Sequence, residues 1–153
     1  MRLLILGGNG MLGHQLWRNL QANHDVWVTL RRPVTDFTSK RLFDPSKSIQ
    51  VKDITDNNTI EQTLNQAQPE AVINCVGVIK QLDEAQNEIK CRKVNAEFPH
   101  QLAKKCKQLS SRLIHFSTDC VFNGTKGNYS EDDPPDATDL YGKTKQQGEV
   151  KES

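Results

Sequence analysis

A tyrosine and a lysine near the end of the chain are spaced so that they could act together on one carbonyl group. Tyr141 and Lys145 are four residues apart, so they share one face if the segment is helical. A phenol can protonate the oxygen of a ketone that receives a hydride, and a nearby ammonium favours this transfer. Thr118 follows an apolar run and could hold the carbonyl, or could bond to its own backbone instead. Together the three side chains predict a reductase.

A glycine-rich turn near the start of the chain has the spacing of a phosphate-binding loop. Its glycines recur at every third position, between an aliphatic run and a segment of helical periodicity. Such a turn offers backbone N–H donors and the positive end of a helix dipole to a pyrophosphate. We therefore predict a dinucleotide site, the alternative being a turn that only packs tightly. The cofactor-binding residues expected here are Gly7, Asn9, Gly10, Met11, Leu12 and Gly13.

Two adjacent arginines indicate which dinucleotide is bound. An acidic residue about twenty positions after the glycines would bind ribose hydroxyls and indicate NAD, but Arg31 and Arg32 occupy that place. Guanidinium groups suit a 2′-phosphate, because their planar fork donates paired hydrogen bonds to phosphate oxygens. The pair predicts NADP (NADPH), with NAD as the alternative if the arginines are only solvated surface charges.

The segments that must position these residues alternate between strand and helix patterns. This rhythm predicts an α/β fold, a Rossmann-type doubly wound parallel sheet with strand order 3-2-1-4-5. Pro99 predicts a kink or break near Phe98 in the long third helix, and one helical turn is expected at residues 40–43 within an otherwise irregular segment. The expected strands are 3–6, 26–30, 49–52, 71–76 and 112–116, and the expected helices are 11–20, 57–66, 79–109 and 137–150, with a long loop at 123–136.

Size and composition narrow the class of protein. A chain of 153 residues is expected to form one domain, 1–153, and its net charge of +1 favours neither nucleic acid nor an anionic membrane as partner. No apolar run is long enough for a membrane span, and the start of the chain lacks the length of a secretory signal. The four cysteines show no CxxC spacing, which predicts reduced thiols in a cytoplasmic protein without a metal site.

Taken together, the motifs resemble a known family. The glycine turn, the Ser-Thr-Asp-x-Val-Phe strand end and Tyr-Gly-x-x-Lys followed by Gly148-Glu149 are similar to the extended short-chain dehydrogenases/reductases, above all to the dTDP-4-dehydrorhamnose reductase family. The similarity runs over essentially the whole chain. It implies NADPH-dependent reduction of the C4 ketone of a dTDP-4-keto-6-deoxy sugar, in nucleotide-sugar and polysaccharide biosynthesis. It also implies a nucleotide-sugar substrate and allows a homodimer.

The resemblance assigns roles to individual residues. Thr118, Tyr141 and Lys145 become the catalytic triad, and Lys145 also holds the nicotinamide ribose. Asn95 matches an asparagine that supports the active-site lysine through the kinked helix, with a helix cap or surface amide as the alternative. The remaining residues expected to line the cofactor are Asp53 and Ile54 against the adenine, and Asn74, Val76 and Gly77.

Two departures from the family pattern concern the substrate more than the chemistry. Cys120 stands where relatives often carry tyrosine, and Cys75 interrupts a turn that is usually rich in alanine. Family members continue past the tyrosine helix with further strands and a substrate domain, so we expect this chain to be the N-terminal, nucleotide-binding portion, truncated before them. The alternatives are an epimerase or dehydratase that retains NAD, and a non-catalytic dinucleotide-binding regulatory subunit.

Overall fold

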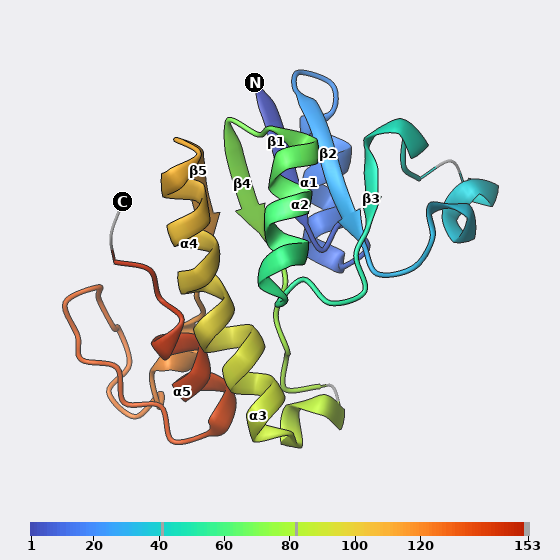
Figure 1. Ribbon diagram of the computed structural model, residues 1–153. Helices are drawn as coiled ribbons and strands as arrows, with labels where there is room; N and C mark the ends of the chain where they lie inside the picture. The colour runs from blue at the N-terminus through green and yellow to red at the C-terminus, as the bar shows by residue number, and fades with distance from the viewer. Residues whose placement is uncertain (41, 82, 152–153) are drawn as a thin grey trace. The chain divides into compact units, whose positions relative to one another are not determined.

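Five strands form a single parallel sheet in the order β3-β2-β1-β4-β5 (Figure 1). The computed structural model describes residues 1–40, 42–81 and 83–151. The expected α/β class and strand order are confirmed. The strands are β1 (Arg2–Leu6), β2 (Asp25–Leu30), β3 (Ser48–Gln50), β4 (Ala71–Asn74) and β5 (Arg112–His115).

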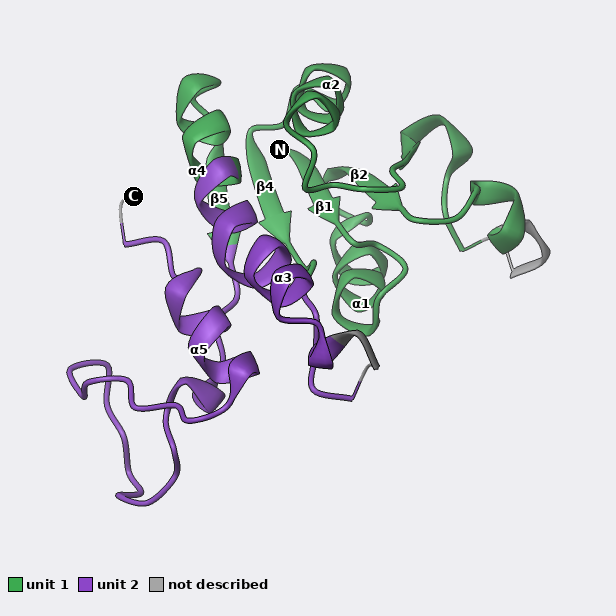
Figure 2. Ribbon diagram, turned by 60° about the horizontal axis from the view of Figure 1, so that its bottom comes forward, with its two compact units in different colours: residues 1–76, 102–114 green, residues 77–101, 115–153 purple. Residues whose placement is uncertain are grey.

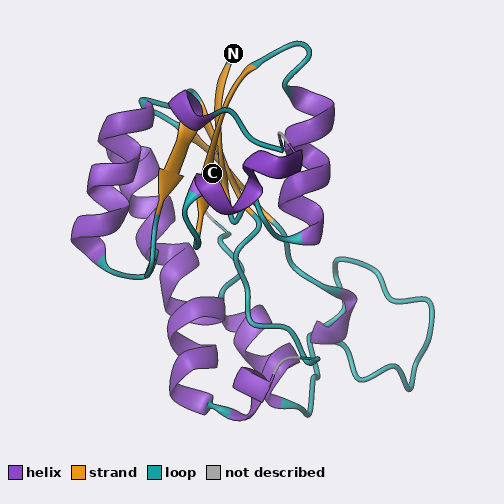
Figure 3. Ribbon diagram, turned by 90° about the vertical axis from the view of Figure 1, so that its right-hand side faces the viewer, coloured by secondary structure: helices purple, strands orange, loops and turns teal. Residues whose placement is uncertain are grey.

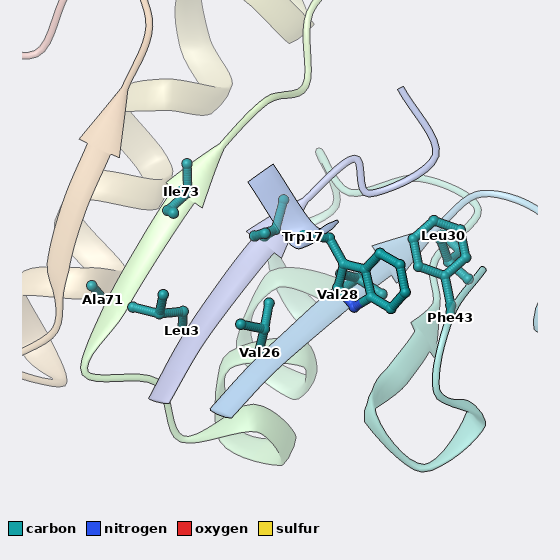
Figure 4. Close-up of a cluster of buried hydrophobic side chains, with 9 residues drawn as sticks. Leu3, Trp17, Val26, Val28, Leu30, Phe43, Ala71 and Ile73 are labelled. Atoms are coloured by element: carbon teal, nitrogen blue, oxygen red, sulfur yellow. The ribbon is translucent and has the colours of Figure 1, made fainter. Parts of the chain in front are cut away.

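The central strands are buried on both faces, which is why their sequences are continuous apolar runs. Leu4 and Leu6 of β1 are buried on one face of the sheet. Alternate residues of β1, β2 and β4 pack on the other face against Trp17 and Phe43 (Figure 4). This cluster contains Leu3, Ile5, Trp17, Val26, Val28, Leu30, Phe43, Ala71 and Ile73.

Helices cover the sheet from both sides, as a doubly wound fold requires. Figure 2 shows α1 (Met11–Leu20) and α2 (Asn57–Ala67) on opposite faces of the strands. The first has the expected bounds, and the second ends one residue later than expected. Asp56 begins α2 by accepting a hydrogen bond from the backbone N–H of Thr59 (2.8 Å).

The long helix expected at residues 79–109 begins later and is continuous through its proline. It consists of α3 (Glu88–Cys91), a π-helical segment (Arg92–Glu97) and α4 (Phe98–Gln108), preceded by a 3-10 turn (Asp83–Gln86). Residue 82 of the expected helix lies outside the described residues. Pro99 cannot donate to the carbonyl of Asn95, and the widened turns that precede it keep the helix unbroken. A kink or a break was expected near Phe98: no break occurs, and the irregularity at that place is a π-helix.

The remaining segments differ from what their sequence patterns predicted. The 137–150 segment is helical only over α5 (Leu140–Gln147), because Asp139 caps its start and Gly148 ends it. The region between β2 and β3 holds two 3-10 helices, η1 (Val34–Lys40) and η2 (Pro45–Lys47), and the turn expected at residues 40–43 includes residue 41, which is not described. Another 3-10 helix, η5 (Asp119–Val121), precedes the long loop (Figure 3).

The chain divides into two compact units, coloured separately in Figure 2. Unit 1 comprises residues 1–76 and 102–114 and contains the sheet; unit 2 comprises residues 77–101 and 115–153 and contains α3, the π-helical segment and α5. The expectation of a single 1–153 domain stays a prediction. Of the helices described, none has the length and apolar character needed to cross a membrane.

Candidate functional site

In unit 1, the predicted cofactor residues follow the carboxyl ends of neighbouring parallel strands. Leu6 pairs with Asn74 across β1 and β4, and Leu30 pairs with Gln50 across β2 and β3. The carboxyl ends of the strands form one edge of the sheet, and this edge carries the glycine turn, the paired arginines, Asp53 and Asn74. This edge is where open parallel sheets bind their ligands.

The glycine turn is fixed by β2. Gly7 has a φ of +81°, a backbone conformation that residues other than glycine rarely adopt. Its N–H donates to the hydroxyl of Thr29 (2.9 Å), and the N–H of Gly8 donates to the carbonyl of Thr29 (2.9 Å). The Thr29 side chain is only 4% exposed. Thr29 thus holds the turn in place, a role that the sequence analysis missed. The one feature of the sequence that could have indicated it is a polar residue within an otherwise apolar strand.

The next two glycines of the motif serve different purposes. A side chain at Gly13 would overlap the backbone of Gly7, so this glycine lets α1 pack directly on the turn. A side chain at Gly10 would meet only the carbonyl oxygen of Gly7, at 3.3 Å, and would otherwise point into open space. Gly10 therefore leaves room for another molecule to approach the backbone.

The start of α1 has free hydrogen-bond donors. Its N-cap residue, Gly10, supplies no side-chain cap, and no acidic residue lies in the first turn. The first intrahelical bond is the one that His14 donates to Gly10, so the N–H groups of Met11, Leu12 and Gly13 have no partner within the helix. The side chain of Met11 is 89% exposed. These donors and the open position at Gly10 fit the pyrophosphate of a dinucleotide.

The two arginines after β2 differ in their surroundings. Both are exposed, and within the described residues Arg31 forms no ion pair. Arg32 lies 3.9 Å from a carboxylate oxygen of Asp36 and stacks over the ring of Phe37, with its guanidinium carbon 5.2 Å from the centroid. Both guanidinium groups could approach a phosphate at the end of β2.

The other predicted residues of unit 1 form local bonds at the strand ends. Asp53 accepts hydrogen bonds from the backbone N–H (2.9 Å) and hydroxyl (2.5 Å) of Thr55, and Ile54 is half-buried beside it. The side chain of Asn74 accepts a hydrogen bond from the N–H of Val76 (3.0 Å). Val76 in turn lies against Gly7. The structure thus brings Asn74 and Val76 to the glycine turn.

In unit 2, α5 carries the predicted proton donor and its lysine. Asp139 caps the helix by accepting a hydrogen bond from the N–H of Gly142 (2.7 Å). Lys145 is only 7% exposed, and its ammonium donates to the carbonyl of Phe116 (2.6 Å). Burial lowers the pKa of Lys145, and the charge of Glu149 opposes this shift. Tyr141 lies one turn earlier and is half-buried.

Thr118 forms the local bonds that were the alternative reading of this residue. Its hydroxyl accepts from the N–H of Cys120 (3.2 Å) and donates to Asp119 (3.2 Å), so that it caps η5. This segment packs closely on α5, because a side chain at Gly142 would overlap the carbonyl of Cys120. The half-buried Thr118 is therefore held on a segment that contacts the tyrosine helix.

Asn95 is buried in unit 2, and its side chain joins two segments of that unit. Its side chain, 1% exposed, accepts from the N–H of Val78 (2.8 Å), donates to the carbonyl of Val78 (2.9 Å) and reaches the hydroxyl of Thr144 at 3.4 Å. These bonds tie the segment after β4, including Gly77, to the residue next to Lys145. They favour the supporting role expected for Asn95 over a surface amide. Gly148 packs directly on the carbonyl of Asn95.

A second cation lies beside Tyr141. Lys80 forms an ion pair with Asp139 (2.7 Å), and its ammonium is 5.6 Å from the centroid of the Tyr141 ring. The pKa of Asp139 is lowered first by the N–H of Gly142 and then by Lys80. Sequence reasoning missed this contact, since Lys80 and Asp139 are far apart in the chain. The one feature of the sequence that points to Asp139 is its residue type, because aspartate at the start of a helix commonly caps it.

The residues that the structure describes include four cysteine thiols and side chains of the types that bind metal ions. All four cysteines are free, as expected from their spacing, and burial raises the pKa of both Cys75 and Cys106 to about 11. Among the residues that the structure describes, no cluster of His, Cys, Asp and Glu side chains could hold a metal ion.

Comparison with known families and sequences agrees with this geometry. Residues 1–151 match the family model described as the RmlD substrate binding domain. Methionine adenosyltransferase 2 subunit beta of Bos taurus is 30% identical over 97% of this chain and 41% of its own length. The dTDP-4-keto-6-deoxy-D-glucose reductase of Streptomyces niveus is 32% identical over 97% of this chain and 46% of its own length. The chain thus spans less than half the length of these relatives.

Solved structures share the fold. A hypothetical dTDP-4-dehydrorhamnose reductase from Sulfolobus tokodaii superposes with a TM-score of 0.81 at 30% identity, over 97% of this chain and 50% of that one. The dTDP-4-dehydrorhamnose reductase of Bacillus anthracis, solved with NADP, gives 0.77 at 24% identity, over 96% of this chain and 47% of that one. At that identity, the second structure supports the fold alone.

Proposed function

The chain belongs to the RmlD substrate-binding domain family, and we propose that it is the dinucleotide-binding part of a reductase that uses NADPH to reduce a nucleotide sugar. The observation that carries the proposal is the start of α1, with free N–H donors after an open glycine turn. Relatives named as dTDP-sugar reductases support the substrate class. Because the chain spans about half their length, the activity of the whole protein is part of the proposal.

On this proposal unit 1 holds the cofactor. The N–H groups at the start of α1 bind the pyrophosphate, Arg31 and Arg32 face the 2′-phosphate, and Asp53 and Ile54 lie against the adenine. The Bacillus anthracis reductase was solved with NADP, and the WbmG enzyme of Bordetella bronchiseptica with NAD. We propose NADPH as the cofactor, with NAD as a second one. When bound, NADPH supplies the hydride.

Unit 2 supplies the groups that handle the proton. Tyr141 gives its phenolic proton to the oxygen of the C4 ketone, and Thr118 holds that oxygen through its hydroxyl. The ammonium of Lys145, on the same face of α5, favours the negative charge that the phenol leaves behind. Asn95 supports Lys145 through the helix that carries it, and Gly77 and Val76 line the cofactor. The proposed substrate is a dTDP-4-keto-6-deoxy sugar.

Titration with NADPH and NADH, followed by nicotinamide fluorescence, tests the cofactor assignment on this chain. We expect NADPH to bind more tightly, because only NADPH carries the 2′-phosphate that the arginines favour. If neither nucleotide binds, the cofactor assignment is wrong.

The chemistry is tested by NADPH oxidation with the keto sugar: Tyr141→Phe is expected to abolish turnover and to leave NADPH binding intact. Turnover that survives this substitution would refute the role of Tyr141.

A second candidate function is a regulatory subunit that binds a dinucleotide without catalysis. It is favoured by relatives named as methionine adenosyltransferase 2 subunit beta, in Bos taurus and Mus musculus among others. Retention of Thr118, Tyr141 and Lys145 favours the reductase. Tight nucleotide binding without turnover of any keto sugar, together with co-purification with a methionine adenosyltransferase, would favour the subunit instead.

A further inference from the structure

The 3-10 helix η1 (Val34–Lys40) places an acid and an aromatic ring against one of the two arginines of unit 1. The guanidinium of Arg32 stacks over the ring of Phe37, 5.2 Å from its centroid, and lies 3.9 Å from a carboxylate oxygen of Asp36. One guanidinium therefore lies against a ring and has part of its charge balanced within the chain. Nothing in the motif of paired arginines requires either contact.

The ring that carries Arg32 is itself anchored to α1. Phe37 meets the edge of Phe43 at a centroid distance of 5.4 Å, and Phe43 packs on Trp17 at 4.9 Å. Trp17 belongs to α1 and is buried in the core cluster (Figure 4). Through these rings, the orientation of Arg32 is fixed to the helix whose first turn has the free N–H donors.

We propose that Asp36 and Phe37 set the preference between NADPH and NADH by acting on Arg32. Phe37 holds the guanidinium plane ready for a phosphate, and Asp36 is an internal counter-ion that the 2′-phosphate of NADPH displaces. The inference rests on the proposed function, because it needs the dinucleotide to bind at the glycine turn. Asp36 and Phe37 are positioning residues in this scheme, since both act through Arg32.

The geometry explains why a 2′-phosphate would displace the Asp36 carboxylate from Arg32. The ion pair is long and exposed, with 65% of the Arg32 side chain and 40% of the Asp36 side chain accessible, and such pairs are weak. A 2′-phosphate can accept two parallel hydrogen bonds from the planar guanidinium and carries more charge than a carboxylate. NADH has no such group and leaves the pair intact. Asp36 therefore lowers the affinity for NADPH and has no effect on NADH.

Binding constants for the two nucleotides test the role of Asp36 on the full chain. Asp36→Asn is expected to tighten NADPH binding about two- to fivefold, the range of an exposed ion pair, and to leave NADH binding unchanged. Glu61→Gln is the matched control, because Glu61 is also an exposed acid that pairs with a basic residue, the half-buried Lys105 (2.6 Å), but lies on α2. This control removes the same charge and is expected to change neither constant.

Two further variants test the route through Arg32. Phe37→Leu keeps an apolar side chain but removes the ring face, and it is expected to weaken NADPH binding about two- to fivefold without affecting NADH. In an Arg32→Gln background, Asp36→Asn is expected to lose its effect. Urea unfolding of each variant checks that the fold is retained.

The outcomes separate this inference from the proposed function. If wild-type protein binds neither nucleotide, both fail. If NADPH binds and Asp36→Asn shifts the two constants equally, or shifts neither, the inference alone fails. Weaker NADH binding in Asp36→Asn would also overturn it, because Asp36 would then bind the ribose hydroxyls. An undiminished effect of Asp36→Asn in the Arg32→Gln background would remove the coupling on which the inference depends.

Discussion

Gly10 and Gly13 belong to one turn, yet an added methyl group meets different surroundings at each. At Gly13 it would overlap the backbone of Gly7, which cannot move without disturbing the turn that Thr29 holds. At Gly10 it would meet a single oxygen at 3.3 Å, on a backbone with a φ of −76° that alanine accepts. Gly13 therefore serves packing, whereas Gly10 serves the approach of the dinucleotide on the proposed function.

We therefore expect Gly13→Ala and Gly10→Ala to fail in different assays. Gly13→Ala should lower the free energy of unfolding by about 1–3 kcal/mol, as overpacking does. Gly10→Ala should change it by less than about 1 kcal/mol but weaken NADPH binding about tenfold or more, because the methyl group occupies the approach to the backbone. Urea unfolding and nucleotide titration measure the two effects. Similar unfolding energies for the two variants would contradict this division.

His115 gives unit 2 a pH-dependent stability. Burial first, and then the positive charges of Lys145 and His100, lower the pKa of His115 from 6.5 to about 4. The folded protein therefore holds this imidazole neutral in a range where the unfolded chain protonates it. The stability that this provides is fully present above pH 6.5 and is lost as the pH falls toward 4.

We expect the free energy of unfolding to drop by about 1–3 kcal/mol between pH 7 and pH 4.5 because of this group. His115→Gln, which cannot be protonated, should flatten that part of the profile. Urea unfolding at several pH values measures it. His24→Gln provides a control at an imidazole outside unit 2. An unchanged slope in His115→Gln would show that other groups carry the acid sensitivity.

Among the elements, α5 is held by more contacts than its short length suggests. Asp139 caps its first turn, Lys145 donates to the carbonyl of Phe116, and Gly148 packs on the carbonyl of Asn95 at its end. Pro99 cannot donate to that carbonyl, and Gly148 approaches it instead. The helix that carries the proposed proton donor is therefore fixed at both ends within unit 2.

Substitutions at Asp139 should separate the helix cap from the ion pair. Asp139→Asn keeps an oxygen for the N–H of Gly142 but loses the charge that Lys80 pairs with, so it should behave like Lys80→Gln and change stability little. Asp139→Ala also loses the cap and should lower the free energy of unfolding by about 1 kcal/mol more. Thermal or urea unfolding compares the three variants. Equal losses in Asp139→Asn and Asp139→Ala would assign the effect to the ion pair.

Across the whole molecule, the sequence predicted best what depends on local pattern. The first strand, the glycine turn and α1 follow from an aliphatic run, three glycines and one helical stripe, and their bounds match closely. The start of the third helix was missed, because the residues after Ile79 have helix-compatible types without periodicity. The π-helical segment was missed because a proline signals only that the regular bonding must change.

Contacts between distant segments could not be predicted at all. The bond from Gly7 to Thr29 and the pair of Lys80 with Asp139 depend on how the chain folds back on itself. The roles assigned to the candidate residues stay predictions. Unit 1 holds those expected to bind phosphate and adenosine, and unit 2 holds Thr118, Tyr141 and Lys145.

The uncapped start of α1 also affects how stable the protein is in the presence of its ligand. An anion can accept hydrogen bonds from donors that no side chain caps, and a ligand that binds only the folded state adds about 2.7 kcal/mol of stability at a hundredfold excess over its Kd. On the proposed function, the melting temperature should rise with the logarithm of NADPH concentration, and this rise should disappear in Gly10→Ala. Differential scanning fluorimetry measures both. The amount of folded protein would then follow the size of the reduced nucleotide pool.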